Sequence, residues 1–208
     1  MRFPLFFYFC GHKSNFFCKF AAFIVYSANN MFSFIKKYFF NKYLAENKPN
    51  RNVSIVSLSR ARSIGILCEI TDEDSYKEIF YIFSKLQEHG HQVRLIGYVN
   101  DKEVPFYCLP QLTADYFSQK HLNWYGIPNM EQIHDFLKED YDLLIDFSYR
   151  PNMPIQAILA LSHAKFIVGR DPESQNSYDL FIDAVNSNYL KYLEAVSTYS
   201  EKLTGNDR

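Results

Sequence analysis

Cysteine is scarce in this 208-residue chain, and its four cysteines include no C-x-x-C pair. A structural zinc site needs closely spaced pairs of ligands, so the sequence predicts none. Two of the cysteines fall in the part that we expect to fold, where lone thiols are typical of small buried hydrophobic residues in a reducing compartment. The four residues are Cys10, Cys18, Cys68 and Cys108.

Glycine is also scarce, with seven residues, and none stands in the turn after the first predicted strand. That turn, residues 68–73, instead contains Glu69, Asp72 and Glu73. Backbone amides cannot approach a pyrophosphate closely there, and the carboxylates would repel it. We therefore predict no dinucleotide cofactor, and the sequence indicates no other. The G-x-S-x-G and H-E-x-x-H motifs are missing as well, so no catalytic or metal-binding residue is predicted.

Acidic residues are nearly missing from the first 62 positions, which hold ten lysines and arginines against Glu46 alone, a balance of +9. Subtraction from the totals leaves 12 basic and 22 acidic residues for 63–208, a balance of −10. A basic arm on an acidic body indicates that the arm meets something anionic, such as nucleic acid, a lipid surface or the body itself. The acidic body is a poor nucleic-acid surface, so we do not expect the domain itself to bind nucleic acid.

No apolar run in residues 1–30 is long enough to cross a bilayer, because Lys13 and Lys19 interrupt it. A signal peptide is one explanation of this segment. The other, which we favour, is translated AT-rich DNA upstream of the gene, with Met31 as the true start. We therefore expect residues 1–30 to be a non-native or disordered extension.

Residues 31–62 are predicted to form a basic amphipathic helix, closed by Pro49, and a polar connector with a short strand over 53–58. One interpretation is a helix that packs on its own domain with its lysines in solvent, and the pattern favours it. The alternative is a helix that binds a partner or a membrane surface. Its apolar side holds Met31, Phe34, Ile35, Tyr38 and Phe39, opposite Lys36 and Lys37.

From Ser63 onward, apolar runs of strand length alternate with helical segments, which predicts a single domain over 63–208. Repeated strand-then-helix units imply a mostly parallel open sheet with helices on both faces, a three-layer, Rossmann-like α/β fold. The predicted strands are 64–68, 93–99, about 115–118, 142–147, 166–169 and 180–184. The predicted helices run from Thr71 as N-cap to about 88, then over 130–138, 154–163 and 189–203.

Ligands of open α/β sheets bind beyond the carboxyl ends of the strands, so polar residues there are candidates for a ligand site. The simpler explanation, helix caps and ordinary polar loops, is favoured. The lone Trp124 is either a partner anchor or, as we favour, a buried plug. The ligand candidates are Glu69, Asp101, Asp146, Ser148, Arg150 and Arg170, and the partner candidates are Lys36, Lys37, Lys42 and Trp124.

The segments SIGIL at 63–67, LNWYG at 122–126, DLLID at 142–146 and ALSHAKF at 160–166 resemble a family of small bacterial α/β proteins of unknown function. This resemblance implies the fold and a short basic N-terminal helix, but no activity. Residues 141–169 also resemble, more weakly, a strand-helix-strand of the N-terminal half of lipopolysaccharide heptosyltransferases. That family binds sugar nucleotide mainly through a second domain, for which this chain is too short, and the chain also lacks the family's glycine-containing turn after the first strand. No catalytic residue is therefore carried over.

The resulting hypothesis is a non-catalytic cytoplasmic interaction domain, peripheral to the inner membrane in one version. Its basic segment, residues 31–50, would contact an anionic partner or membrane face. The alternative is a small-molecule-binding or glycosyltransferase-like enzyme that uses the strand ends, with Asp146, Ser148 and Arg150 in its site.

Overall fold

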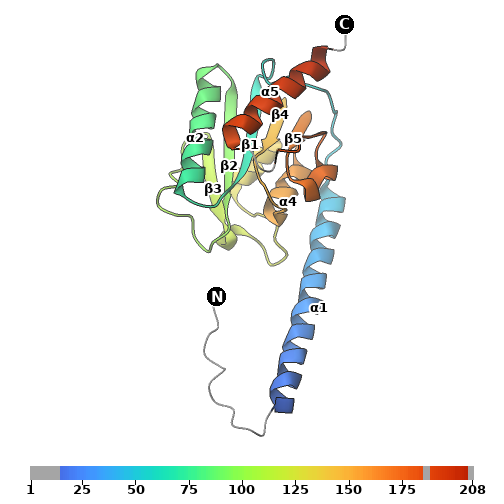
Figure 1. Cartoon of the computed structure of the whole chain (residues 1–208). Helices are drawn as coiled ribbons and strands as arrows, with labels where there is room; N and C mark the ends of the chain where they lie inside the picture. The colour runs from blue at the N-terminus through green and yellow to red at the C-terminus, as the bar shows by residue number, and fades with distance from the viewer. Residues whose placement is uncertain (1–14, 185–187, 206–208) are drawn as a thin grey trace.

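The computed structural model describes residues 15–184 and 188–205, and its body is a six-stranded, all-parallel sheet with helices on both faces (Figure 1). The predicted three-layer α/β class is confirmed. The strands are β1 Ser63–Ile70, β2 Gln92–Val99, β3 Ala114–Ser118, β4 Leu143–Asp146, β5 Phe166–Gly169 and β6 Leu180–Phe181. The helices are α1 Asn15–Asn47, α2 Glu73–Glu88, α3 Glu131–Lys138, α4 Met153–Leu161 and α5 Tyr189–Gly205, with 3-10 turns at Gln119–His121 and Pro172–Ser177.

The strand order is β3-β2-β1-β4-β5-β6. The chain therefore builds outward from β1 in one direction, returns, and builds outward from β4 in the other. This reversal between β1 and β4 is the switch point of a doubly wound sheet, where the loops after the two strands diverge. The central strands are buried on both faces, which explains why their sequences are continuous apolar runs.

Side chains of alternate residues along the strands pack into two separate hydrophobic cores, one on each face of the sheet. Ile66 of β1 belongs to the core under α2 and α5, together with Phe83 and Val196. Leu67, the next residue of β1, belongs to the core under α3 and α4, together with Phe136. This alternation is the period of two that a strand imposes on its side chains.

Helix α2 begins one residue later than the sequence predicts, with Asp72 rather than Thr71 as the N-cap. The carboxylate of Asp72 accepts a 2.7 Å hydrogen bond from the backbone N–H of Ser75, and the Ser75 hydroxyl accepts one from the N–H of Asp72. This reciprocal pair satisfies two of the free donors of the first turn. The helix ends at Glu88 with His89 as its C-cap, and Gly90 follows with a φ of +89° that favours glycine.

Two copies of a Tyr-Asp dipeptide serve the same structural role at the strand starts. Oδ2 of Asp142 accepts a hydrogen bond from the backbone N–H of Arg62, just before β1, at 2.8 Å. Oδ2 of Asp179 accepts one from the N–H of Ile167 in β5, also at 2.8 Å. Each carboxylate therefore joins its own chain segment to the start of the neighbouring parallel strand.

Helix α1 runs over 33 residues and extends away from the sheet (Figure 1). It continues N-terminally of Met31 to Asn15, where the sequence predicts no helix. Among the described residues, no helix is long and apolar enough to cross a membrane. The C-terminal part of α1 packs on the body, through Phe40 against Ala157 of α4.

The connector after α1 is extended rather than a strand over 53–58. Two hydrogen bonds hold it to the segment just before β5. The Arg51 Nε donates to the carbonyl of Ala164 at 2.8 Å, and the N–H of Ser54 donates to the carbonyl of Lys165 at 3.1 Å. The guanidinium of Arg51 also pairs with Asp179.

Candidate ligand-binding site

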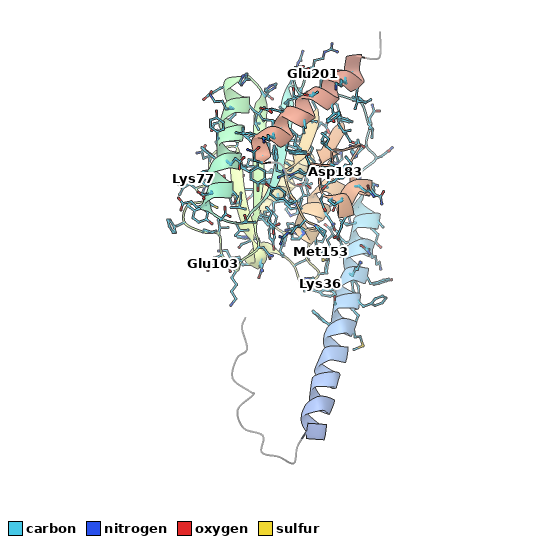
Figure 2. All side chains as sticks on the ribbon, in the orientation of Figure 1. Lys36, Lys77, Glu103, Met153, Asp183 and Glu201 are labelled. Carbon is cyan, nitrogen blue, oxygen red and sulfur yellow. The ribbon has the colours of Figure 1, made fainter. Side chains whose placement is uncertain are left out.

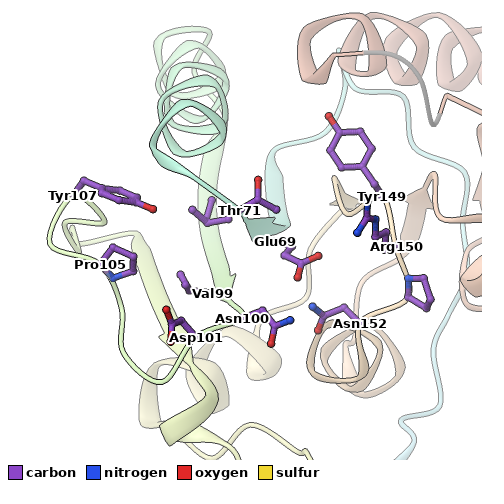
Figure 3. A pocket seen from close by; sticks show the side chains of 12 residues that line it. Glu69, Thr71, Val99, Asn100, Asp101, Pro105, Tyr107, Tyr149, Arg150 and Asn152 are labelled. Carbon is purple, nitrogen blue, oxygen red and sulfur yellow. The ribbon is translucent and has the colours of Figure 1, made fainter. Parts of the chain in front are cut away.

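A cleft of about 1030 Å³ lies at the switch point, beyond the carboxyl ends of β1, β2 and β4 (Figure 3). Three loops form its walls: the turn from β1 to α2, the segment after β2, and the segment between β4 and α4. The residues that line it are Glu69, Ile70, Thr71, Val99, Asn100, Asp101, Pro105, Tyr107, Tyr149, Arg150, Pro151 and Asn152. The cleft is therefore polar at its centre and flanked by two tyrosines (Figure 3).

Glu69 is the central acid of the cleft and lies one residue before the end of β1. Its side chain is half-buried, and this burial raises the pKa of the carboxyl above its ordinary value. The amide of Asn152 and the charge of Arg150 act in the opposite direction and lower the pKa, without cancelling the effect of burial. Glu69 therefore titrates closer to neutral pH than a solvated glutamate.

Asn152 has a structural and a lining role at once. It is the N-cap of α4, and its Oδ1 accepts a hydrogen bond from the backbone N–H of Ile155. Pro154, in the first turn of α4, suits this start because a helix leaves its first N–H groups without a partner. The cap fixes the Asn152 side chain at the rim of the cleft, where it faces Glu69 (Figure 3).

The third wall carries Asn100 and Asp101, which follow β2. Oδ1 of Asn100 accepts hydrogen bonds from Nε2 of Gln119 at 2.9 Å and from the hydroxyl of Tyr98 at 3.3 Å. Oδ1 of Asp101 accepts from the N–H of Lys102 at 2.6 Å. The Asn100 side chain is thus oriented by its neighbours, and its amide points into the cleft with Glu69 and Asn152 (Figure 3).

Three of the six ligand candidates from the sequence, Glu69, Asp101 and Arg150, line this cleft. The other three, Asp146, Ser148 and Arg170, do not, because they are buried beneath it. Each of them ends or closely follows β4 or β5, strands that are covered by helices on both faces of the sheet.

Asp146 is the last residue of β4 and is fully buried. Its Oδ1 accepts a hydrogen bond from the backbone N–H of Ser148 at 2.9 Å, and its Oδ2 accepts one from the hydroxyl of Tyr178 at 2.8 Å. Burial raises its pKa to about 6, although these hydrogen bonds favour the charged form. Asp146 thus shapes the loop that carries Arg150 and Asn152 rather than reaching the cleft.

Arg170 follows β5 and is buried among three tyrosines. Its Nη2 donates a 2.7 Å hydrogen bond to the carbonyl of Phe147, and its Nε donates to the same oxygen at 3.2 Å. The Cζ of the guanidinium lies 3.7 Å from the ring centre of Tyr149, 4.7 Å from that of Tyr192 and 4.9 Å from that of Tyr189. Cations bind the faces of aromatic rings, so Arg170 holds Tyr149, one wall of the cleft, in place.

Sequence reasoning missed Tyr107, Tyr149 and Asn152 as lining residues. For Asn152 a signal existed, because an asparagine shortly before a proline that opens an apolar helix is typical of an N-cap at a strand-to-helix turn. No sequence signal pointed to Tyr107, since it lies in the irregular segment between β2 and β3. Among the described residues, no three histidines, cysteines or acids lie close enough together to hold a metal ion.

The remaining candidates lie outside the cleft. Trp124 is half-exposed rather than a buried plug. Its ring packs edge-on against that of Phe39 in α1, with 5.1 Å between the two ring centres. Lys37 and Lys42 are exposed on α1, and Lys36 lies beside the turn at Gly126. The partner candidates thus gather on α1 and on the turn before α3.

Strand order and cleft together define a doubly wound α/β protein with a polar cleft at its switch point. The model of a family of unknown function, DUF6913, matches residues 33–203, and the chain belongs to this family. The predicted membership of a family of unknown function is confirmed, whereas nothing supports its predicted bacterial origin. The match begins inside α1. The chain matches no curated protein and no solved structure, so the heptosyltransferase resemblance gains no support.

Proposed function

We propose that this DUF6913 domain binds a small hydroxylated molecule, uncharged or cationic, in the cleft at the switch point. The observation that carries the proposal is the convergence of Glu69, Asn100 and Asn152 from three different loops on one polar centre (Figure 3). Open α/β sheets bind their ligands at this place. A few well-placed polar groups inside a concave site are what fixes the orientation of a small ligand.

The charges favour this ligand class over a phosphate ester. Glu69 and Asp101 line the cleft, and Asp72 and Glu73 follow at the start of α2, whereas Arg150 is the one cation among the lining residues. Carboxylates repel phosphate, while they accept hydrogen bonds from hydroxyl and ammonium groups. The N-terminus of α2, which could otherwise attract an anion, is already capped by Asp72.

The two tyrosines supply the apolar part of the site. Tyr107 and Tyr149 stand on opposite sides of the polar centre (Figure 3). Aromatic walls bury the carbon faces of a ligand, and amide and carboxylate groups read its polar edge. Polyols, monosaccharides, amino sugars and nucleosides all combine these two features.

Thermal unfolding of the full chain with a panel of these compounds tests the proposal. A ligand that binds the native state raises Tm in proportion to RT ln(1 + [L]/Kd), about 2.7 kcal/mol at a hundredfold excess over Kd. Glu69→Gln and Asn152→Ala should each abolish most of the shift. Glu194→Gln, an exposed acid on α5, is the matched control and should leave the shift unchanged.

Two results would contradict the proposal. One is that no hydroxylated compound stabilises the wild-type chain. The other is that inorganic phosphate or a nucleotide stabilises it more strongly than its uncharged parent compound, since the cleft would then select an anion.

A further inference from the structure

The part of α1 beyond the body presents a large aromatic and aliphatic face to solvent. Phe34 is 74% exposed and Met31 64% exposed, although side chains of this kind are usually buried. The helix packs on the body through the opposite side, where Phe40 is buried with Tyr43 and Leu44 beside it. The exposed set, here called the aromatic face, is Met31, Phe32, Phe34, Ile35, Tyr38 and Phe39.

This arrangement reverses the favoured interpretation of the sequence. The side of the helix with most of the apolar residues was expected to pack on the domain, and it is the side that faces solvent. At 100° per residue, Phe40 lies on the far side of the helix from Met31, Ile35 and Tyr38. Apart from the contacts of Phe32 and Phe39 with Trp124, the aromatic face is open to solvent in the described structure.

Trp124 extends the aromatic face onto a second element. It lies in the turn before α3, and its ring centre is 5.1 Å from that of Phe39 and 6.5 Å from that of Phe32. About half of Trp124 is exposed. The aromatic face is thus in contact with the body of the domain through Trp124.

Lysines border the aromatic face. At 100° per residue, the exposed Lys37 lies at one edge of the face, and the half-buried Lys36, which packs beside Gly126, lies at the other. The exposed Lys42 follows one turn beyond Tyr38. The single acid of α1, Glu46, lies 3.9 Å from Lys42. Residues 63–208 carry a net charge of −10, so the positive charge of this end contrasts with the rest of the molecule.

We infer that the aromatic face docks onto the surface of a bilayer that contains anionic lipid. Phenylalanine, tryptophan and tyrosine rings settle at the boundary between headgroups and acyl chains, and flanking lysines reach back to the headgroups. The charge pattern matches this occupant, because the lysines meet anionic headgroups while the acidic body is held away from them. A second copy of the chain would set the same lysines against each other.

Vesicle co-sedimentation with the full chain tests the inference. Phosphatidylcholine vesicles with phosphatidylglycerol should bind the wild-type chain, and those of phosphatidylcholine alone should bind it much less. Phe34→Ser should lower the partition coefficient roughly tenfold, as expected for one buried aromatic side chain. Lys37→Glu should lower it toward the value for neutral vesicles, and high salt should act in the same direction.

Helix α5 offers matched controls at the opposite end of the body (Figure 2). Tyr199 is exposed there and Lys202 lies 5.5 Å from its ring, so the pair reproduces an exposed aromatic residue beside a lysine. Tyr199→Ser and Lys202→Glu should bind vesicles like the wild type. All four substitutions are at the surface, and circular dichroism should show the same folded state for each variant as for the wild type.

Three results would overturn the inference. The first is no binding of the wild-type chain to either kind of vesicle. The second is equal binding of the Phe34 and α5 variants, or equal binding to neutral and anionic vesicles. The third is that the wild-type chain binds no vesicles but forms a dimer in light scattering, and that Phe34→Ser dissociates this dimer. A second copy of the chain would then be the occupant of the aromatic face. None of these results depends on whether the cleft binds a ligand.

Discussion

The hydroxyl of Tyr178 donates a 2.8 Å hydrogen bond to Oδ2 of the buried Asp146, and so links the segment before β6 to the end of β4. The ring of Tyr178 also covers Gly169, the last residue of β5. One tyrosine therefore joins three neighbouring strands beside the cleft. The contribution of Tyr178, Asp146 and Gly169 to the free energy of unfolding can be measured without knowledge of the ligand.

The pH dependence of stability should show the burial of Asp146. Its pKa is raised from 3.8 to about 6, so the native state binds this proton more tightly than the unfolded state does. The stabilisation is complete below about pH 4 and is lost as the pH rises through about 6. The shift corresponds to about 3 kcal/mol. Asp146→Asn removes the titration but keeps an acceptor for Tyr178.

Urea unfolding of both chains from about pH 4 to about pH 7 measures this effect. The free energy of unfolding of Asp146→Asn, relative to wild type, should rise across this range by an amount approaching 3 kcal/mol. Asp183→Asn, an exposed acid in the corresponding position of the second Tyr-Asp segment, is the control. Parallel pH profiles for Asp146→Asn and wild type would show that Asp146 is not perturbed.

Gly169→Ala should destabilise the domain by about 2 kcal/mol or more, the upper part of the range for overpacked cores. A Cβ at this position would overlap the ring of Tyr178. The ring would have to move, and its hydrogen bond to Asp146 would break. Gly205→Ala, where the added Cβ meets nothing within 4 Å, is the control and should not destabilise. Equal urea midpoints for the two variants would contradict this packing.

Arg170→Lys should cost about 2 kcal/mol or more in urea unfolding, although it keeps the charge. An ammonium group cannot stack flat between Tyr149 and Tyr192 while it donates twice to the carbonyl of Phe147. Arg60→Lys, an exposed arginine, should change the free energy of unfolding by no more than about 0.5 kcal/mol. If Arg170→Lys lowers the free energy of unfolding no more than this control does, the packing of the tyrosines does not depend on the guanidinium.

Asp72→Ala should destabilise α2 by about 1 kcal/mol, the usual loss for an N-cap residue. Thr71→Ala should cost clearly less, since the structure makes Asp72 the cap. The comparison tests whether Asp72, as in the structure, or Thr71, as predicted from the sequence, is the N-cap of α2. A larger loss for Thr71→Ala in thermal or urea unfolding would favour that prediction.

Residues with a strong local signal could be placed from the sequence. The strand over Phe166–Gly169 is predicted with its observed bounds, because an apolar run of strand length lies between polar segments. Helix α2 ends where Gly90 predicts it. The cleft candidates Glu69, Asp101 and Arg150 follow from the rule that parallel strands bring their carboxyl ends to one edge.

Features that depend on tertiary neighbours could not be placed in this way. Asp146 and Arg170 occupy strand ends like the cleft residues do, and only the packing of Tyr178 and Tyr149 over them shows that they are buried. For α1, periodicity shows two faces but not which one meets the body. That choice depends on Ile127 and Ala157, which lie far away in the sequence.

Lys36 and Met153 both lie beside Gly126, and Met153 follows directly after the cleft residue Asn152 (Figure 2). The outer part of α1 and the rim of the cleft are therefore near neighbours on one end of the molecule. A protein held to a sheet of lipid by this end would take its cargo from the thin layer of solution next to that sheet. Anionic headgroups raise the concentration of cations in that layer, so a cationic ligand would reach the cleft at a higher concentration than in bulk solution, whereas an uncharged ligand would not.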